Sequence, residues 1–104
     1  MNWQNDSNSG WSEVDSWENN YAFIDQSGSS NNAVIRQRAP RNYAEIIQQG
    51  AGNQATIIQK AAFNRASINQ SGNSNFAEII QLSPGNTALI IQSGSSNTAS
   101  IIQD

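Results

Sequence analysis

Polar and hydrophobic residues alternate in a fixed order along most of the chain, beginning at residue 20. Asn, Ala, Ile and Gln occupy every second position of a seven-residue unit, N-x-A-x-I-x-Q, which recurs every eleven residues, eight times in all. Alternate side chains of a β-strand lie on the same face. Each unit therefore predicts a strand whose four repeated residues share one face. Because those residues never change, we expect that face to form the interior.

Two amide side chains in each unit make this interior unusual. A buried amide without a partner is costly. If equivalent residues stack in register, each amide can donate to one neighbour and accept from the other, as in the amide ladders of cross-β structures. The residues that we predict to form ladders and to mediate polymerisation are Asn20, Gln26, Asn31, Gln37, Asn42, Gln48, Asn53, Gln59, Asn64, Gln70, Asn75, Gln81, Asn86, Gln92, Asn97 and Gln103.

The four-residue linkers between units alternate in kind. Every second linker has a turn glycine in its second position, at Gly28, Gly50, Gly72 and Gly94, whereas the linkers RAPR, KAAF and LSPG have none there. Glycine adopts positive φ readily and favours a tight reversal. The structural repeat is therefore 22 residues long and consists of strand, glycine arc, strand and second arc. Four such rungs span residues 20–37, 42–59, 64–81 and 86–103.

Two topologies are compatible with short linkers. Antiparallel hairpins would place the Asn of one unit opposite the Gln of the next, and the ladders would be lost. Parallel stacking of alternate strands preserves every ladder. We therefore predict an all-β fold, a flattened parallel two-sheet β-solenoid with amyloid-like cross-β stacking. Four rungs at roughly 4.8 Å give a stack about 19 Å tall.

Residues 1–19 lie outside the repeat and form a separate leader before the solenoid of residues 20–104. The leader contains Trp3, Trp11 and Trp17, which are all the tryptophans of the chain, and four acidic residues with no basic one. It has no alternating or helical period. We expect a mobile polar leader, because termini are usually loose unless they are tied down. The alternative is a recognition segment or a cap over the first rung.

The outward columns follow from the 22-residue period. Ile58, Ile80 and Ile102 form a candidate lateral surface, since exposed apolar strips often mark contacts; alternatively, β-branched residues simply favour strand stacking. Tyr43 and Arg65 share a column and predict a cation–π pair. The basic residues of the second arcs are either gatekeepers against self-association or a polyanion-binding edge.

Composition narrows the function classes. The net charge is −3, so no nucleic-acid partner is required. The chain has no Cys and no His, which removes thiolate metal sites and the usual general base. We predict neither enzymatic activity nor a cofactor or metal. No apolar run is long enough to span a membrane. No signal peptide is visible, and we expect an export signal to have been removed before Asn2.

The predicted solenoid has open ends. Monomeric solenoids cover their ends with atypical capping repeats, but here the last unit is as regular as the others. An uncovered edge is a template for another strand. A head-to-tail contact that does not close produces a filament, so we predict a homopolymer.

Segments such as NYAFIDQSGSSNNAVIRQ and NTALIIQSGSSNTASIIQ resemble the curlin repeat, which shares the core Q-x-G-x-x-N-x-A-x-x-x-Q. The resemblance covers residues 20–104. It implies a structural subunit of curli, the extracellular functional amyloid of bacterial biofilms, located at the cell surface and serving matrix formation and adhesion. It also implies other curlin subunits and the curli secretion and assembly factors as partners.

Three alternatives stay open. Asn at the start of both half-repeats is similar to the minor, nucleating curlin, whereas the lack of a divergent basic last repeat favours the major subunit. The regularity is also compatible with a consensus-like design. In a different class, the chain would be a monomeric β-solenoid that binds carbohydrate or ice, although Thr56, Thr87 and Thr98 do not form one column.

Overall fold

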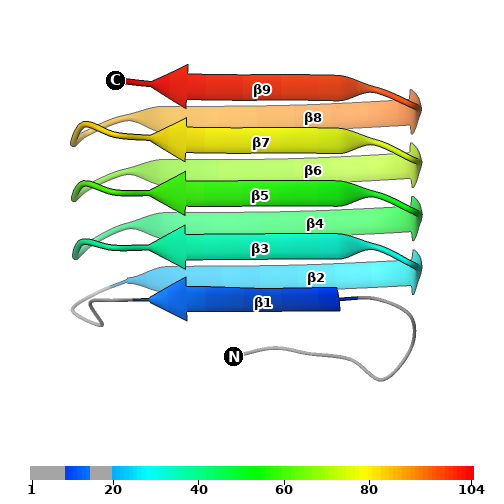
Figure 1. The fold of residues 1–104 in the computed structure, drawn as a ribbon, viewed down its shortest axis with the longest axis horizontal. Helices are drawn as coiled ribbons and strands as arrows, with labels where there is room; N and C mark the ends of the chain where they lie inside the picture. Colours follow the sequence, from blue (N-terminus) through cyan, green and yellow to red (C-terminus); the bar gives the residue numbers. More distant parts are fainter. Residues whose placement is uncertain (1–8, 15–19) are drawn as a thin grey trace.

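The computed structural model describes residues 9–14 and 20–104, with side chains from residue 20 onward. The described residues form two parallel sheets (Figure 1). One sheet contains β2 (Tyr21–Ser29), β4 (Tyr43–Ala51), β6 (Arg65–Asn73) and β8 (Thr87–Ser95). The other contains β1 (Ser9–Val14), β3 (Asn32–Gln37), β5 (Gln54–Gln59), β7 (Phe76–Gln81) and β9 (Thr98–Gln103).

The chain winds as the sequence predicts, with one strand per half-turn, so that consecutive strands alternate between the two sheets. Strands of the same sheet pair in parallel with partners 22 residues apart, for example Ile24 with Ile46 and Gln37 with Gln59. The predicted all-β, two-sheet solenoid of four 22-residue rungs is therefore confirmed. We call the edges of β2 and β3 the rung-one end and the edges of β8 and β9 the rung-four end.

The core lies between the sheets and consists of the repeated residues. The isoleucines of the middle layers, Ile35, Ile46, Ile57, Ile68 and Ile79, are 0% exposed. Their alanine neighbours keep the two sheets close, because Ala adds little thickness beside each Ile. The two middle rungs each bury two isoleucines and two alanines, whereas Ala22, Ala99 and Ile101 in the end rungs are only partly buried. The hydrophobic contribution is therefore largest in the middle of the stack.

The strands β2, β4, β6 and β8 are longer than expected and continue through the glycine arc for nine residues each. The chain then turns at the residue two positions after each glycine, where φ is positive: Ser30 (58°), Gly52 (69°), Ser74 (57°) and Ser96 (59°). The second arc has its own positive-φ position at Arg41, Phe63 and Gly85. The glycine arc thus contains two positive-φ positions, the glycine and the residue two positions later, whereas the second arc contains one. The alternation of the sequence identified only the glycines.

One strand was not predicted. Ser9–Val14 forms β1, which pairs in parallel with the outer edge of β3, from Ser9 beside Asn32 to Val14 beside Gln37. Its offset is 23 residues and not 22, and it lacks the repeated residues, so the periodic pattern contained no signal for it. An edge strand presents unpaired N–H and C=O groups, and these bind an extended segment regardless of its pattern. The rest of the leader, residues 1–8 and 15–19, lies outside the described residues.

Candidate polymerisation interface

The glutamines form two continuous amide ladders inside the solenoid. In the first sheet the Nε2 group of each donates to Oε1 of the next at 2.8 Å, from Gln26 through Gln48 and Gln70 to Gln92. In the second sheet the distances are 3.1, 2.9 and 2.9 Å, from Gln37 to Gln103. All donate in the same direction, toward the rung-four end.

The second hydrogen of each amide links the two sheets. Gln48 Nε2 donates to the Asn32 carbonyl at 3.1 Å, and Gln59 Nε2 donates to the Tyr43 carbonyl at 2.8 Å. Each interior glutamine therefore makes one bond along its column in each direction and one bond across the core. Because Gln48 and Gln59 are 0% exposed, removal of either would leave buried polar partners without a hydrogen bond.

The asparagines are bonded differently from the predicted amide-to-amide ladder. Asn53 Oδ1 accepts the backbone N–H of Asn75 at 3.0 Å, and Asn53 Nδ2 donates to the carbonyls of Gln49 and Gly72, both at 3.1 Å. The shorter Asn side chain lies at the corner between arc and strand, where backbone groups are within reach and the neighbouring amide is not. Both kinds of column therefore join neighbouring rungs: the Gln columns through amide-to-amide bonds, and the Asn columns through amide-to-backbone bonds that also fix the arcs.

The turn glycines serve close stacking as well as backbone conformation. Gly50 has φ of 116°, and a Cβ placed on it would overlap the carbonyl oxygen of Gly72 in the next rung. Gly28 meets Gly50 in the same way, and Gly72 meets Gly94. At Gly94 the nearest atom to such a Cβ is Asn97 Nδ2, 3.6 Å away. The tight contact is thus a property of stacked rungs, and it ends where the stack ends.

The two ends of the second-sheet ladder have complementary vacancies. At the rung-one end Gln37 is 0% exposed, and its Oε1 accepts no hydrogen bond from the described part of the chain. At the rung-four end Gln103 Nε2 donates to the Thr87 carbonyl at 2.8 Å, and the described residues offer its second hydrogen no ladder acceptor. An acceptor at one end therefore matches a donor at the other.

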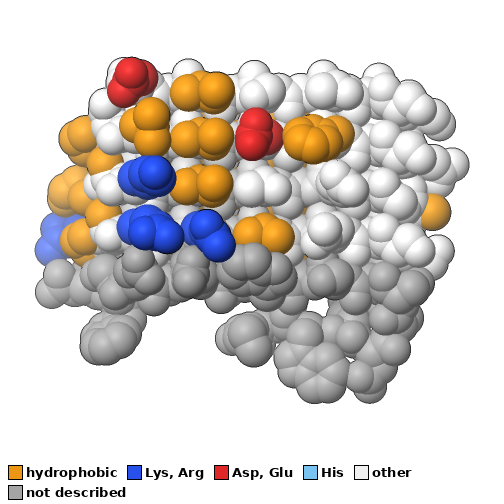
Figure 2. Space-filling view, in the orientation of Figure 1, with side chains coloured by type: hydrophobic (Ala, Val, Ile, Leu, Met, Phe, Trp, Pro, Cys, Tyr) orange, Lys and Arg blue, Asp and Glu red, His pale blue; other side chains and the backbone are white. Residues whose placement is uncertain are grey.

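The outer faces have columns of their own. Ile58 and Ile80 are half-buried and Ile102 is 63% exposed, and the three stack in register on the face seen in Figure 2. On the same face, the Lys and Arg side chains gather toward the rung-one end, in the lower part of the described face in Figure 2.

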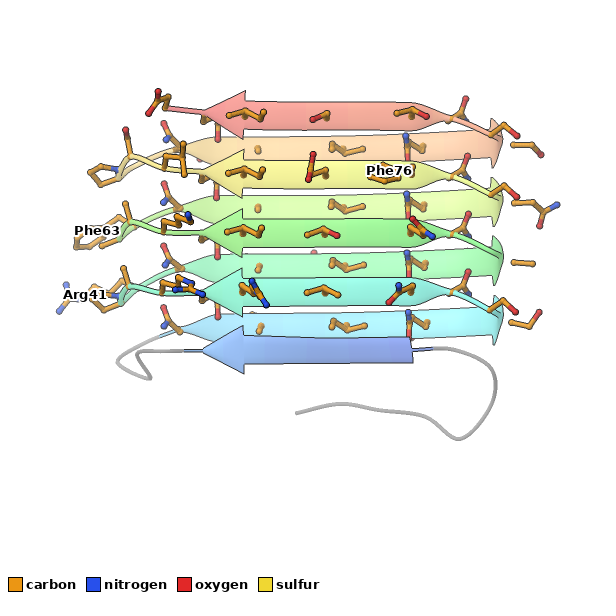
Figure 3. The ribbon with its side chains drawn as sticks, in the orientation of Figure 1. Arg41, Phe63 and Phe76 are labelled. Carbon is orange, nitrogen blue, oxygen red and sulfur yellow. The ribbon has the colours of Figure 1, made fainter. Side chains whose placement is uncertain are left out.

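Ring contacts also run from rung to rung. The predicted cation–π pair is confirmed, since the Arg65 guanidinium lies 4.9 Å from the Tyr43 ring centroid. Tyr43 also stacks on Tyr21, with centroids 4.8 Å apart. A second pair, Arg41 over Phe63 at 5.5 Å, projects from the arc (Figure 3). We did not predict it, although the 22-residue spacing of the two residues was the available signal.

Two kinds of feature do not occur in the described part of the chain. No three acidic residues gather there into a group that could hold a metal ion. No helix long and apolar enough to cross a membrane occurs among the same residues.

A family profile described as the Curlin associated repeat matches residues 39–72 and 72–104. The chain belongs to the curlin repeat family. A search of curated proteins gave no match. The matched segments include rungs two to four, and residues 20–37 of rung one carry the same N-x-A-x-I-x-Q spacing. Curlin-repeat proteins are structural amyloid subunits of extracellular surface fibres and not enzymes, so this chain is a structural subunit of the curli type.

Proposed function

We propose that this curlin-repeat chain polymerises head to tail into an extracellular amyloid fibre, with the rung-four end of one copy stacked on the rung-one end of the next. The observation that carries the proposal is Gln37 Oε1, which is buried and accepts no hydrogen bond from the described residues. By register it is the position that Gln103 Nε2 of a neighbouring copy reaches when the ladder continues for one more step. A buried acceptor without a partner is costly, and this contact would satisfy it.

The junction would repeat the internal stacking at each inward position. A further 22-residue step places β8 beside β2 of the next copy and β9 beside its β3. Glutamine then stacks on glutamine and glycine on glycine, since the repeated residues are identical in every rung. The contact between copies would therefore have the geometry of the contact between rungs.

The backbone at the rung-four end is suited to this pairing. Phe76 N–H donates to the Asn97 carbonyl and Leu82 N–H to the Gln103 carbonyl, so the β7 residues at these alternate positions face β9. The corresponding residues of β9 are Thr98, Ser100 and Ile102, and by the same alternation their N–H and C=O groups point away from β7. Such a free parallel edge is a template for another strand.

Outward residues across the junction are also compatible. Leu89, 58% exposed at the rung-four end, would stack beside Phe23 of the next copy. Asp104 is the last position of the column of residues 38, 60, 82 and 104, so it would lie next to Arg38 of the neighbouring copy. An apolar pair and an opposite-charge pair each favour cross-strand stacking.

The biological role follows from the family and belongs to the same proposal. The fibre would serve in biofilm matrix and adhesion, together with other curlin subunits and the curli secretion and assembly factors. A nucleating role would use the same open ends, and cross-seeding of a second curlin subunit by this chain would distinguish it from a bulk fibre subunit.

The test is seeded growth of the purified chain, followed by thioflavin-T fluorescence, with a proline at the rung-four edge. Ser100→Pro removes an N–H that faces outward, so the isolated solenoid keeps its internal ladder. We expect seeded growth to fall at least about tenfold because the edge can no longer donate at that position. Ser100→Ala is the matched control and is expected to grow like the unmodified chain.

Urea unfolding of freshly refolded protein separates the interface from the fold. The proposal requires both variants to unfold at nearly the same urea concentration as the unmodified chain. Growth of Ser100→Pro at the unmodified rate would contradict head-to-tail pairing through β9. A stable monomer that does not respond to seeds would favour the binding-module alternative.

A further inference from the structure

The outer edge of β3 is already occupied in the isolated chain. Ser9–Val14 pairs with β3 along all six residues and forms the last strand of the second sheet (Figure 1). The first sheet has no strand outside β2 among the described residues. The rung-one end is therefore stepped, with one strand more in the second sheet than in the first.

This step conflicts with the head-to-tail contact. The proposed fibre requires β9 of an incoming copy at the edge of β3, where β1 lies. If β1 stayed in place, β9 could pair only with β1, and β8 would be separated from β2 by two strand spacings, roughly 9.6 Å. The glutamine ladder of the first sheet would then be interrupted at every junction. Both sheets can continue only if β1 leaves.

β1 is also a poorer partner for β3 than β9 would be. By register it brings Gly10, Ser12 and Val14 to the positions of Ala33, Ile35 and Gln37. The strand β9 would bring Ala99, Ile101 and Gln103 to the same positions.

The difference between β1 and β9 as partners of β3 is clearest at Gln37, where the glutamine ladder of the second sheet ends. By register Val14 occupies the ladder position next to Gln37, and valine as a residue type has no side-chain hydrogen-bonding group. Gln37 Oε1 accepts no bond from the described residues. Exchange of β1 for β9 would satisfy that oxygen and extend the isoleucine core.

We propose that β1 is an exchangeable strand, which closes the rung-one end of the free subunit until β9 of a second copy displaces it. The inference rests on the proposed head-to-tail function and identifies its partner surface, the outer edge of β3. The occupant after exchange is a second copy of this chain. Fibre growth then includes a strand-displacement step, and release of β1 controls its rate.

A reversible covalent lock tests the proposal in the full chain. Trp11 and Val34 are register partners, and the chain has no cysteine of its own, so Trp11→Cys with Val34→Cys introduces a single pair. Paired strands bring Cα atoms within the range that a disulfide requires. The matched control is Thr56→Cys with Glu78→Cys, which links β5 to β7 inside the solenoid, where no strand exchanges.

The oxidised β1–β3 lock is expected to lower elongation from unmodified seeds at least about tenfold, and reduction is expected to restore it, because β9 can then reach β3. The control disulfide is expected to elongate equally in both redox states. Equal elongation of the oxidised and reduced β1–β3 variant would overturn the proposal. Failure of the reduced variant and of the unmodified chain to elongate would instead count against head-to-tail polymerisation itself.

A second pair of variants releases β1 without a crosslink. Asn32 N–H donates to the Asn53 carbonyl, so by alternation the N–H of Arg36 also points toward β5. Glu13 is the register partner of Arg36, and its N–H points in the same direction along the stack, which is toward β3. Glu13→Pro is therefore expected to shorten the lag of seeded growth at least about threefold. Ser12→Pro, whose N–H faces away from β3, is the control. An unchanged or longer lag for Glu13→Pro would also overturn the proposal.

Discussion

Gly50 lies so close to Gly72 of the next rung that a Cβ on Gly50 would occupy the place of the Gly72 carbonyl oxygen. The obstacle is backbone, which cannot move aside as the end of a long side chain can. The glycine column therefore sets the closest approach of the rungs along one arc. It also makes this arc more sensitive to substitution than the other.

Gly50→Ala should be among the most damaging single changes in the chain. The substitution combines a positive φ of 116° with the overlap against the Gly72 carbonyl. We expect the free energy of unfolding in urea to fall by about 3 kcal/mol or more. Gly85→Ala is the control, because Gly85 has positive φ but no atom within 4 Å of the added Cβ. Its expected cost is about 1 kcal/mol, and equal losses for the two variants would contradict the stacking role.

The interior amides should matter more than the outward acids. Gln48→Ala removes the donor to Gln70 and Asn32 and the acceptor of Gln26, all in the core. We expect a loss of about 3 kcal/mol or more in urea unfolding, with slower seeded growth.

Glu45→Ala is the matched outward change in the same strand. Glu45 is half-buried and accepts one bond, from Ser67 Oγ at 3.3 Å, so about 1 kcal/mol or less is expected. Asn53→Ala and Glu78→Ala form a second pair with the same order. Equal effects within either pair would remove the energetic argument for the ladder.

The junction charge should be detectable by reversal and rescue. Asp104→Arg would place two cations in neighbouring layers of the column that contains Arg38, and seeded growth is expected to slow by about two- to fivefold. Adding Arg38→Asp restores opposite charges and should recover most of the rate. The effect should shrink at high salt, because exposed charges are screened. Absence of rescue in the double variant would argue against contact between these two positions.

Bundling tests the isoleucine column. We predict that Ile58→Thr with Ile80→Thr yields thinner bundles in electron micrographs and leaves seeded growth unchanged, because threonine keeps the β-branched shape and loses apolar surface. Ile47→Thr, a half-buried outward change on the other sheet, is the control. Bundles of unchanged width would mean that the column serves strand stacking alone.

The sequence was sufficient for the fold because the pattern and the topology constrain each other. A seven-residue alternation predicts a strand, and only parallel stacking superimposes Gln26 on Gln48 and Gln37 on Gln59. The inward position of the glutamines and the two sheets followed from this requirement. Any one-residue slip in register would have moved the isoleucines to the outside.

The remaining features depend on backbone geometry that a residue pattern does not encode. The asparagine amides bond to arc carbonyls, whose positions exist only once the arc is built, as with Asn53 and Gly72. The positive-φ corners fall on residues as different as Ser30, Arg41 and Phe63. The strand Ser9–Val14 forms because β3 has a free edge, and no periodic signal marks it. The residue pattern predicts which positions repeat, but it does not predict which backbone groups the side chains at those positions contact.

The common direction of the glutamine bonds has an electrical consequence. From Gln26 to Gln92 and from Gln37 to Gln103, each amide points its nitrogen toward the rung-four end and its oxygen toward the rung-one end. Strand dipoles in a sheet nearly cancel, but aligned side-chain dipoles add. In a fibre of such subunits the axial dipole of the glutamine ladders would grow in proportion to length. The asparagine oxygens, which point toward the rung-four end, would oppose it at the corners of every rung.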